Sequence, residues 1–503
     1  MNMKKVAKIT TWVMLAALAM PDRFEAQEKG AAHHHYKLID MGTFGGPQSY
    51  VNEPPNSFAP ILNEKGMATG WADTSSPDPF CFMDCFVTHA FRWDHGQKDD
   101  LGVLPDGASS ASTWISANGL VSGYSQNGET DPLIPGFPEV RAVLWQNGGI
   151  TDLGVLEGGY ESIAQAVNNR GQVVGLFTNT NVDPFSMLGL GYQARAFIWQ
   201  KGVMQDLGTL GGPDAQAVLI NERGQVVGWS YTNSDPGACS GSGLALTTDS
   251  FIWEEGKGMN DLGNFGGTCT LAADINNRGQ VVGTSWLAGD LVFHAFLWEN
   301  GILHDLGVSF GGNSGALAIN QAGDAVGFGY PAGATAHHAA LWRRTGQTKD
   351  LGILFSGDSA YGFSVNAKLQ VVGREFSPGG AATAFFWEND SMVDLNTLIP
   401  PGSSLYLTDP VTINDRGEVA GDGVDANGNV HAFLLSPCDE NHAGVEGCDY
   451  SLFDAAAVQS SAAPLAQSQV GATQGSLTPA QMKDRIRARM LNRSDRFKTL
   501  PKE

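Results

Sequence analysis

Four Asp-Pro pairs recur at one position of a repeating sequence, and they are the residues whose type and spacing most suggest chemistry. Each lies seven or eight residues after a glycine that closes an apolar segment: Asp78-Pro79, Asp131-Pro132, Asp183-Pro184 and Asp235-Pro236. A carboxylate beside the carbonyl groups of a turn suits a hard cation such as Ca²⁺. The interpretation we favour is a turn that the Asp side chain initiates and proline fixes. These four aspartates are the predicted binding residues, with structural Ca²⁺ as the alternative and no other cofactor expected.

Other residues with chemical potential are few. His33-His34-His35 could bind a metal weakly, but a flexible polar lead-in is the favoured interpretation. The segment Asp425-Ala-Asn-Gly-Asn429 resembles part of a calcium loop, yet no Glu follows at the needed spacing, which favours a hairpin turn. The sequence contains no Gly-x-Ser-x-Gly, His-Glu-x-x-His or Gly-x-x-x-x-Gly-Lys motif. No catalytic residue is therefore predicted, although scattered Asp and His could still converge in the fold.

The six cysteines form three couples that are close in the sequence, Cys81/Cys85, Cys239/Cys269 and Cys438/Cys448. An even number of cysteines behind a secretion signal is typical of disulfides in an oxidising compartment. A structural zinc site would need paired Cys-x-x-Cys motifs, which are missing here. We therefore predict disulfides.

The elements that must position these residues belong to a repeat. Asp-Leu-Gly, or a close variant, is followed by an apolar segment that usually ends in Asn-x-x-Gly, then by an apolar pair closed by Gly, and then by a segment such as His294-Ala-Phe-Leu-Trp298. Turn residues separate four short runs that are rich in β-branched and aromatic residues, and no window has the 3.6-residue period of a helix. Asn147-Gly148 and Asn300-Gly301 suit two-residue hairpins. Each repeat is therefore predicted to be four antiparallel strands.

A unit of four strands cannot bury both faces of its sheet alone, so the repeats must stack, and closing the stack into a ring removes its exposed ends. A lone strand at Tyr36 to Gly42 precedes the first repeat, and the last repeat stops one strand short at His431 to Leu435. The sequence therefore predicts an all-β, eight-bladed β-propeller of four-stranded antiparallel blades, closed by the N-terminal strand joining the last blade.

One aromatic residue per repeat is expected to pack between blades rather than to bind a ligand. These residues are Trp93, Trp145, Trp199, Trp253, Trp298, Trp342 and Trp387, with Leu435 in the eighth repeat. Histidine occupies another repeated position at His89, His294, His338 and His431, but Arg141, Arg195, Asp249 and Thr383 replace it elsewhere. The histidines therefore cannot form one shared metal ring.

The recurring triplet, as at His89-Ala90-Phe91 and His431-Ala432-Phe433, resembles the extracellular repeats of the HAF family. The Asp-Leu-Gly and Ile-Asn-x-x-Gly-Gln-Val-Val-Gly phrases resemble that family too, over about residues 36 to 435. Repeats two, three, four and seven depart from the literal triplet, and Leu369 stands where glycine is expected. The resemblance implies a secreted bacterial protein with a propeller-like fold. It implies no established activity and no catalytic residues.

Differences between repeats point to one face. The distance from the Gly to the His-Ala-Phe position is 19, 18, 20 and 21 residues in repeats one to four, and 11, 11, 10 and 10 in repeats five to eight. In an antiparallel meander this connection lies on the same face as the link between blades. Long loops on a rigid scaffold are where binding usually resides. Ligand contacts are therefore expected on the long-loop face of blades 1–4.

Composition places the chain outside the cell. Lys4, Lys5 and Lys8 precede an apolar run from Thr11 to Ala19, which is typical of a secretory signal and too short to span a bilayer. The formal net charge of −22 argues against DNA or RNA as partners. No later segment has eighteen apolar residues, so no membrane span is expected. The protein is predicted to be secreted or periplasmic and monomeric.

The expected organisation is a signal peptide at 1–19, a linker at 20–35, the propeller at 36–448, a flexible linker at 449–477 and a short basic C-terminal helix at 478–503. We expect a non-catalytic binding or interaction protein whose extracellular ligand is a glycan or a protein. The alternative is an extracellular propeller enzyme, such as a hydrolase or lyase of a polysaccharide, with its site in the central channel. A purely structural envelope component is a third possibility.

Overall fold

The computed structural model describes residues 33–51, 61–80, 85–134, 136–156, 158–189, 191–239, 244–356, 358–377 and 382–438. The predicted signal peptide, linker residues 20–32 and the tail from 449 lie outside them. The described residues form β-strands and two short 3-10 helices, η1 (Gly307–Ser309) and η2 (Leu395–Leu398), which confirms the predicted all-β class. None of the described helices is long and apolar enough to cross a membrane.

The strands form four-stranded antiparallel meanders, which we call modules and number in chain order. Module 1 contains β2 (Gly45–Tyr50), β3 (Ala68–Pro77), β4 (Phe86–Asp94) and β5 (Gln97–Asp100). Module 2 contains β6 (Ser110–Ile115), β7 (Val121–Thr130), β8 (Pro138–Gln146) and β9 (Gly149–Asp152). Module 3 contains β10 (Ser162–Val167), β11 (Val173–Val182), β12 (Tyr192–Gln200) and β13 (Val203–Asp206). Module 4 contains β14 (Ala215–Ile220), β15 (Val226–Cys239), β16 (Leu244–Glu254) and β17 (Gly258–Asp261).

The second half repeats this plan. Module 5 contains β18 (Gly266–Ile275), β19 (Val281–Leu287), β20 (Phe293–Glu299) and β21 (Ile302–Asp305). Module 6 contains β22 (Ser314–Ile319), β23 (Ala325–Gly329), β24 (His338–Trp342) and β25 (Thr348–Gly352). Module 7 contains β26 (Ser359–Val365), β27 (Val371–Phe376), β28 (Ala382–Glu388) and β29 (Ser391–Asp394). Module 8 contains β30 (Tyr406–Ile413), β31 (Val419–Val424) and β32 (Val430–Pro437), and β1 (Tyr36–Asp40) is its fourth strand. Modules 4 and 5 share one sheet through a single parallel bridge between Thr248 and Cys269.

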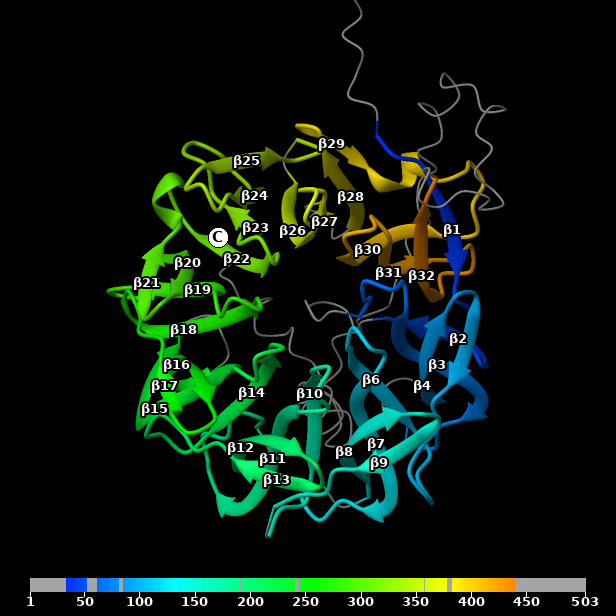
Figure 1. The fold of residues 1–503 in the computed structure, drawn as a ribbon, viewed down its shortest axis with the longest axis vertical. Coiled ribbons are helices and arrows are strands. Elements are labelled where there is room, and N and C mark those ends of the chain that lie inside the picture. The colour runs from blue at the N-terminus through cyan, green and yellow to red at the C-terminus, as the bar shows by residue number, and fades with distance from the viewer. Residues whose placement is uncertain are drawn as a thin grey trace, which may run out of the picture. The chain divides into compact units, whose positions relative to one another are not determined.

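Within residues 33–438 the modules follow one another in chain order, and the first strands β6, β10, β14, β22, β26 and β30 lie nearest the middle of the view (Figure 1). The two ends of the sheets carry different connections. We call the end with the connections from second to third strands and from module to module the loop face. The opposite end, with the connections from first to second and from third to fourth strands, is the turn face.

The Asn-x-x-Gly-Gln motif forms the first turn of a module and contacts the next module. In module 3 the Asn168 Oδ1 accepts the backbone N–H groups of Arg170 and Gln172, at 3.0 and 3.1 Å. Its Nδ2 donates to the Gln172 Oε1 at 2.8 Å and to the backbone oxygen of Asn221 in module 4 at 3.1 Å. A buried side chain thus satisfies its own turn and ties it to the neighbouring turn, which explains why this residue type recurs.

The same intermodule bond recurs around the described modules. The Nδ2 groups of Asn63, Asn168, Asn221, Asn276, Asn320, Asn366 and Asn414 donate to the backbone oxygens of Ser116, Asn221, Asn276, Asn320, Asn366, Asn414 and Asn63, at 2.9 to 3.1 Å. Module 2 has Ser116 at this position, and there the Asn118 amide donates to the Asn169 backbone oxygen at 3.0 Å. The bond from Asn414 runs from the last module to the first.

Module interiors depend on a close approach between backbone and ring. A Cβ added to Gly70 would lie 2.1 Å from the Tyr50 carbonyl oxygen and 2.8 Å from the Phe91 ring, and only glycine avoids this clash. The phenylalanine of the His-Ala-Phe triplet therefore packs on the glycine that ends the apolar pair. The repeated tryptophans are buried or, at Trp298, partly buried in the hydrophobic clusters, which confirms their predicted packing role.

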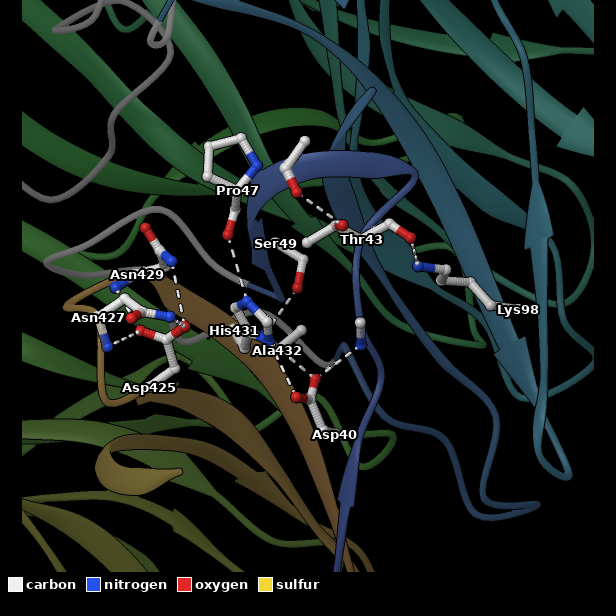
Figure 2. Close-up of polar contacts among 12 residues, drawn as sticks. Asp40, Thr43, Pro47, Ser49, Lys98, Asp425, Asn427, Asn429, His431 and Ala432 are labelled. Atoms are coloured by element: carbon white, nitrogen blue, oxygen red, sulfur yellow. Dashed lines mark hydrogen bonds and ion pairs between the residues drawn. The ribbon is translucent and has the colours of Figure 1, made fainter. Parts of the chain in front are cut away.

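The first and last modules are joined by the contacts that join other neighbours. β1 pairs with β32 antiparallel, with Leu38 opposite Leu435. The Ala432 N–H donates to the Ser49 Oγ at 3.0 Å, as the Ala90 N–H does to the Ser110 Oγ between modules 1 and 2. Figure 2 shows Ala432 facing Ser49 beside the His431 side chain. The N-terminal strand therefore lies in the sheet of the last module, as predicted from the sequence.

We predict that Asn414→Ala and Asn276→Ala lower the free energy of unfolding equally, by about 2 to 4 kcal/mol each. Each substitution removes two bonds that the Oδ1 accepts from backbone N–H groups of its own turn. It also removes two bonds that the Nδ2 donates, one within the turn and one to the next module. Urea unfolding followed by tryptophan fluorescence measures both. A clearly smaller loss for Asn414→Ala would contradict the bond between the last and first modules.

Candidate functional site

The long connections of modules 1–4 are mostly strand rather than loop. β3, β7, β11 and β15 have 10, 10, 10 and 14 residues, whereas β19 has 7 and β23 has 5. The pairing continues past irregular points to Pro77 opposite Phe86 and to Val182 opposite Tyr192. The extra residues therefore project as hairpins whose tips begin at the Asp-Pro pairs in modules 1–3. This corrects the expectation of long loops, because backbone pairing extends further than the apolar pattern.

Three of the four predicted binding aspartates form turns. The Oδ1 atoms of Asp78, Asp131 and Asp183 accept the N–H of the residue two positions later, at 2.8, 2.7 and 2.9 Å. Their backbone N–H groups close the hairpin tips by donating to the carbonyl oxygens of Cys85, Phe137 and Gly191. The three side chains are buried, at 5, 0 and 4% exposure. This is the geometry of the turn interpretation, in which the carboxylate holds the tip.

Asp235 lies in the part of β15 for which only the backbone is described, so its side chain is not placed.

The predicted disulfides are also only partly covered by the described residues. No cysteine in the described part of the chain is free, but Cys81 and Cys448 lie outside it. The disulfides therefore stay a prediction.

One of these aspartates meets a second buried carboxyl group. Asp214, in the link before β14, accepts the N–H groups of Met187 and Ala194 from the module 3 hairpin. Burial raises the pKa of Asp214 to about 8; the nearby charge of Asp183 adds to the rise, and the bonds from the two N–H groups oppose it. Asp214 is therefore largely protonated at neutral pH. The pair fastens the hairpin to the sheet behind it.

Each histidine at the first position of the triplet pairs with the aspartate of the Asp-Leu-Gly, or Asp-Met-Gly, on the fourth strand of its own module. The Nδ1 atoms of His89, His294, His338 and His431 lie 2.8 to 2.9 Å from the nearest carboxylate oxygens of Asp100, Asp305, Asp350 and Asp40. The same carboxylates accept the N–H two residues later, as in Gly42 to Asp40 at 2.7 Å. Figure 2 shows His431 between Asp40 and the Pro47 carbonyl oxygen. The two motifs thus recur together because they are hydrogen-bonded, a link that sequence reasoning missed.

Module 4 shows what happens when the histidine is absent. Asp249 occupies the position and is buried near Asp261. Burial, followed by repulsion from Asp261, raises the pKa of Asp249 to about 6. Arg195 in module 3 instead makes an ion pair with Asp206 at 3.0 Å.

The histidine run before β1 is anchored rather than a free lead-in. The His34 backbone N–H and Nδ1 lie 2.9 Å from oxygens of Glu388 in module 7. The His35 carbonyl oxygen accepts the N–H of Cys438 at 2.8 Å. The prediction of a flexible linker was therefore wrong for residues 33–35, because the buried Glu388 offers a partner that lies far away in sequence.

A second group of polar residues, which the sequence analysis did not identify, lies in modules 6 to 8. The His337 Nδ1 is 2.9 Å from the Tyr361 hydroxyl, and burial lowers the pKa of His337 to about 4 and raises that of Tyr361 to about 12. The Arg374 guanidinium donates to the buried Asp409 carboxylate at 2.9 Å. No spacing in the sequence indicates this group, since its members come from three modules. Among the described residues, no three His, Cys, Asp or Glu side chains converge as metal ligands.

Five of the seven large apolar side chains that are exposed in the described chain lie on the loop face, spread over several modules. Phe80 and Leu291 follow second strands, Val182 ends one, and Val308 and Phe355 lie in links between modules. The other two, Val203 and Ile302, lie on the turn face. Phe80 is 40% exposed and its ring centroid is 6.1 Å from that of Phe137 in the neighbouring hairpin. These residues extend into modules 5–7, beyond the four modules singled out from loop length.

Comparison with known proteins assigns no family. No family model and no curated protein matches the chain. Solved structures that are similar include the β-propeller domain of the Trilobed protease from Pyrococcus furiosus, with 9% identity, a TM-score of 0.40 and coverage of 72% of this chain and 98% of that one. A puromycin-hydrolyzing peptidase from Mycobacterium tuberculosis has 12% identity, a TM-score of 0.39 and coverage of 77 and 61%. Virginiamycin B lyase from Staphylococcus aureus has 10% identity, a TM-score of 0.34 and coverage of 64 and 92%. Likenesses at this level carry no activity over to this chain.

The Asp183–Asp214 pair predicts a pH dependence. Because the folded-state pKa of Asp214 is raised to about 8 from its ordinary 3.8, its contribution to stability is complete below about pH 4 and is lost as the pH rises through about 8. We predict that Asp214→Asn gains at least about 1 kcal/mol relative to wild type between pH 5 and pH 8.5 in urea unfolding.

The exposed Asp390→Asn, which changes the formal charge equally, serves as the control for Asp214→Asn. Parallel pH profiles of wild type and Asp214→Asn would contradict a raised pKa of Asp214 in the folded protein.

Proposed function

We propose that this chain is a secreted, non-catalytic binding protein of the HAF type, with an eight-bladed closed β-propeller that presents its loop face to an extracellular ligand. The observation that carries the proposal is that five of the seven exposed large apolar residues of the described chain lie on that face, two of them, Phe80 and Val182, at hairpins whose tips are held by buried aspartates. Exposed apolar side chains on a rigid support favour binding. A partner that covers them displaces water, and the backbone loses little conformational entropy because it is already ordered.

Closure of the propeller is supported by the β1–β32 ladder, through which the N-terminal strand completes the last module, and by two bonds between the last and first modules. These are the Ala432 to Ser49 bond and the Asn414 to Asn63 bond. Both bonds have counterparts between modules that are neighbours in sequence. A closed ring also leaves no module with an uncovered sheet face, which the size of a four-stranded sheet requires.

A glycan fits the loop face best among the ligands considered. Aromatic rings such as Phe80 and Phe137 can stack on the apolar faces of sugar rings, and Asn179 and Gln193 of module 3 supply polar groups on the same face. Secretion, which the N-terminal segment predicts, would place the protein among extracellular polysaccharides.

The enzymatic alternative is supported by the raised pKa of Asp214 and by the shifted pKa values of the His337–Tyr361 pair. The Asp214 carboxyl, however, accepts backbone N–H groups of the hairpin and is fully buried, and the ring nitrogen Nδ1 of His337 is already hydrogen-bonded to the Tyr361 hydroxyl.

The experiment is a glycan array probed with the full secreted chain, followed by affinity measurements on the best ligand. Phe80→Ser combined with Val182→Ser should weaken binding at least about tenfold, because both side chains are exposed on the loop face. Val203→Ser combined with Ile302→Ser is the matched control, since it removes two equally exposed apolar side chains from the turn face.

Unchanged affinity of the control with a loss in the loop-face variant supports the proposal. Equal affinities of the two variants would contradict the loop face as the binding site. Failure of the wild-type chain to bind any glycan would overturn the choice of ligand, and turnover of a bound glycan would overturn the non-catalytic assignment.

A further inference from the structure

Three consecutive modules place an arginine at the same position of the turn face. Arg170, Arg223 and Arg278 each follow the Asn-x of an Asn-x-Arg-Gly-Gln turn in modules 3, 4 and 5. All three are exposed, and we call them the arginine arc. They lie at the opposite end of the sheets from the loop face, so a ligand here would be independent of the proposed function.

The three side chains lean across the next turn in one direction. The Arg223 Nη1 donates to the Arg278 carbonyl oxygen at 3.0 Å, and the Arg278 Nη1 donates to that of Ala322 at 2.9 Å. The Arg170 guanidinium lies against Gly224, where an added Cβ would be 2.3 Å from its Nη2. Each guanidinium has five N–H donors, so the single bond that Arg223 and Arg278 each make to the next module orients the group and leaves donors for a ligand.

The charge of the arc is opposite to that of the protein. The whole chain has a formal net charge of −22. Beside the three arginines, the preceding turn position holds the neutral Asn169 and Asn277 and the acidic Glu222, which accepts the Asn169 N–H. Glu254 also lies close to Arg223 but pairs with Lys257 at 2.9 Å. Lys65, Lys368 and Arg416 hold the same turn position in modules 1, 7 and 8, so cations recur on this face, and the arc is the stretch where arginine fills it in three successive modules. On a chain of net negative charge, such a stretch attracts an anion locally.

We propose that the arginine arc binds a linear polysaccharide that bears carboxylates. Guanidinium groups bind planar carboxylates through paired hydrogen bonds, and three of them on successive modules match a polymer with a charge on each of several sugars. A nucleic acid fits less well, because the formal net charge of −22 repels a polymer with a phosphate on every nucleotide. A nucleic acid is therefore treated as an outcome of the test.

The test measures binding of the full chain to polygalacturonate at low salt, with neutral dextran and double-stranded DNA as comparison probes. The triple variant Arg170→Gln, Arg223→Gln and Arg278→Gln should raise the dissociation constant for polygalacturonate at least about tenfold. Wild-type binding should weaken as salt is added. The corresponding triple Lys variant retains the charge and should bind with intermediate affinity, because it lacks the paired donors.

The matched control changes three exposed cations outside the arc, Lys201→Asn, Arg344→Gln and Lys368→Gln, and alters the net charge equally. The affinity of this control for polygalacturonate should equal that of wild type.

The proposal is overturned if wild type does not bind polygalacturonate, if the Gln triple variant binds as well as wild type, or if the control variant loses as much affinity as the Gln triple variant. It is also overturned if dextran or DNA binds as tightly. The basic tail is common to every variant, so binding by the tail would appear as no change in the Gln triple. Thermal melts of each variant establish that it is folded.

Discussion

The structure depends on a constraint that acts between neighbouring sheets. A four-stranded sheet has two faces to bury and too few residues to bury either alone, so each module is stable only against the modules on both sides. In seven of the eight modules the asparagine of the first turn meets this constraint: its amide donates to the backbone of the next turn, and its oxygen accepts two N–H groups of its own turn, as Asn168 does. Within a module, the triplet phenylalanine packs on the glycine of the second strand, as Phe91 does on Gly70.

This frame makes the loop face rigid. The hairpins of modules 1–3 continue the ladders of their sheets, and buried carboxyl groups hold their tips and bases. Exposed apolar side chains can therefore be presented without the loss of order that a loose loop would suffer on binding. The turn face has a different chemistry, in which polar side chains link successive turns and arginines lie across them. The two ends of one repeated unit are thus suited to different partners.

Much of the fold was predictable because it follows from repetition. The period of the Asp-Leu-Gly, Val-Val-Gly and Trp positions determines the four strands, and the missing last strand indicates where Tyr36–Asp40 belongs. The roles of the polar residues were less accessible. The pairing of His89 with Asp100 is local, and the coincidence of the two motifs was a signal that could have revealed it. The contacts of Asp214 with the preceding hairpin, or of Tyr361 with His337, join modules at positions that do not repeat, and no periodic pattern encodes them.

The central claim is that β1 completes the sheet of the last module, and amide hydrogen exchange of the full chain tests it most directly. The Met41 N–H donates to the Ala432 oxygen at 2.9 Å, and the equivalent N–H groups of Leu207 and Leu306 donate at 2.9 Å within modules 3 and 5. The account predicts that peptides spanning residues 36–42 exchange as slowly as those spanning 203–207 and 302–306. Rapid exchange at 36–42, with the other two segments still protected, would contradict it.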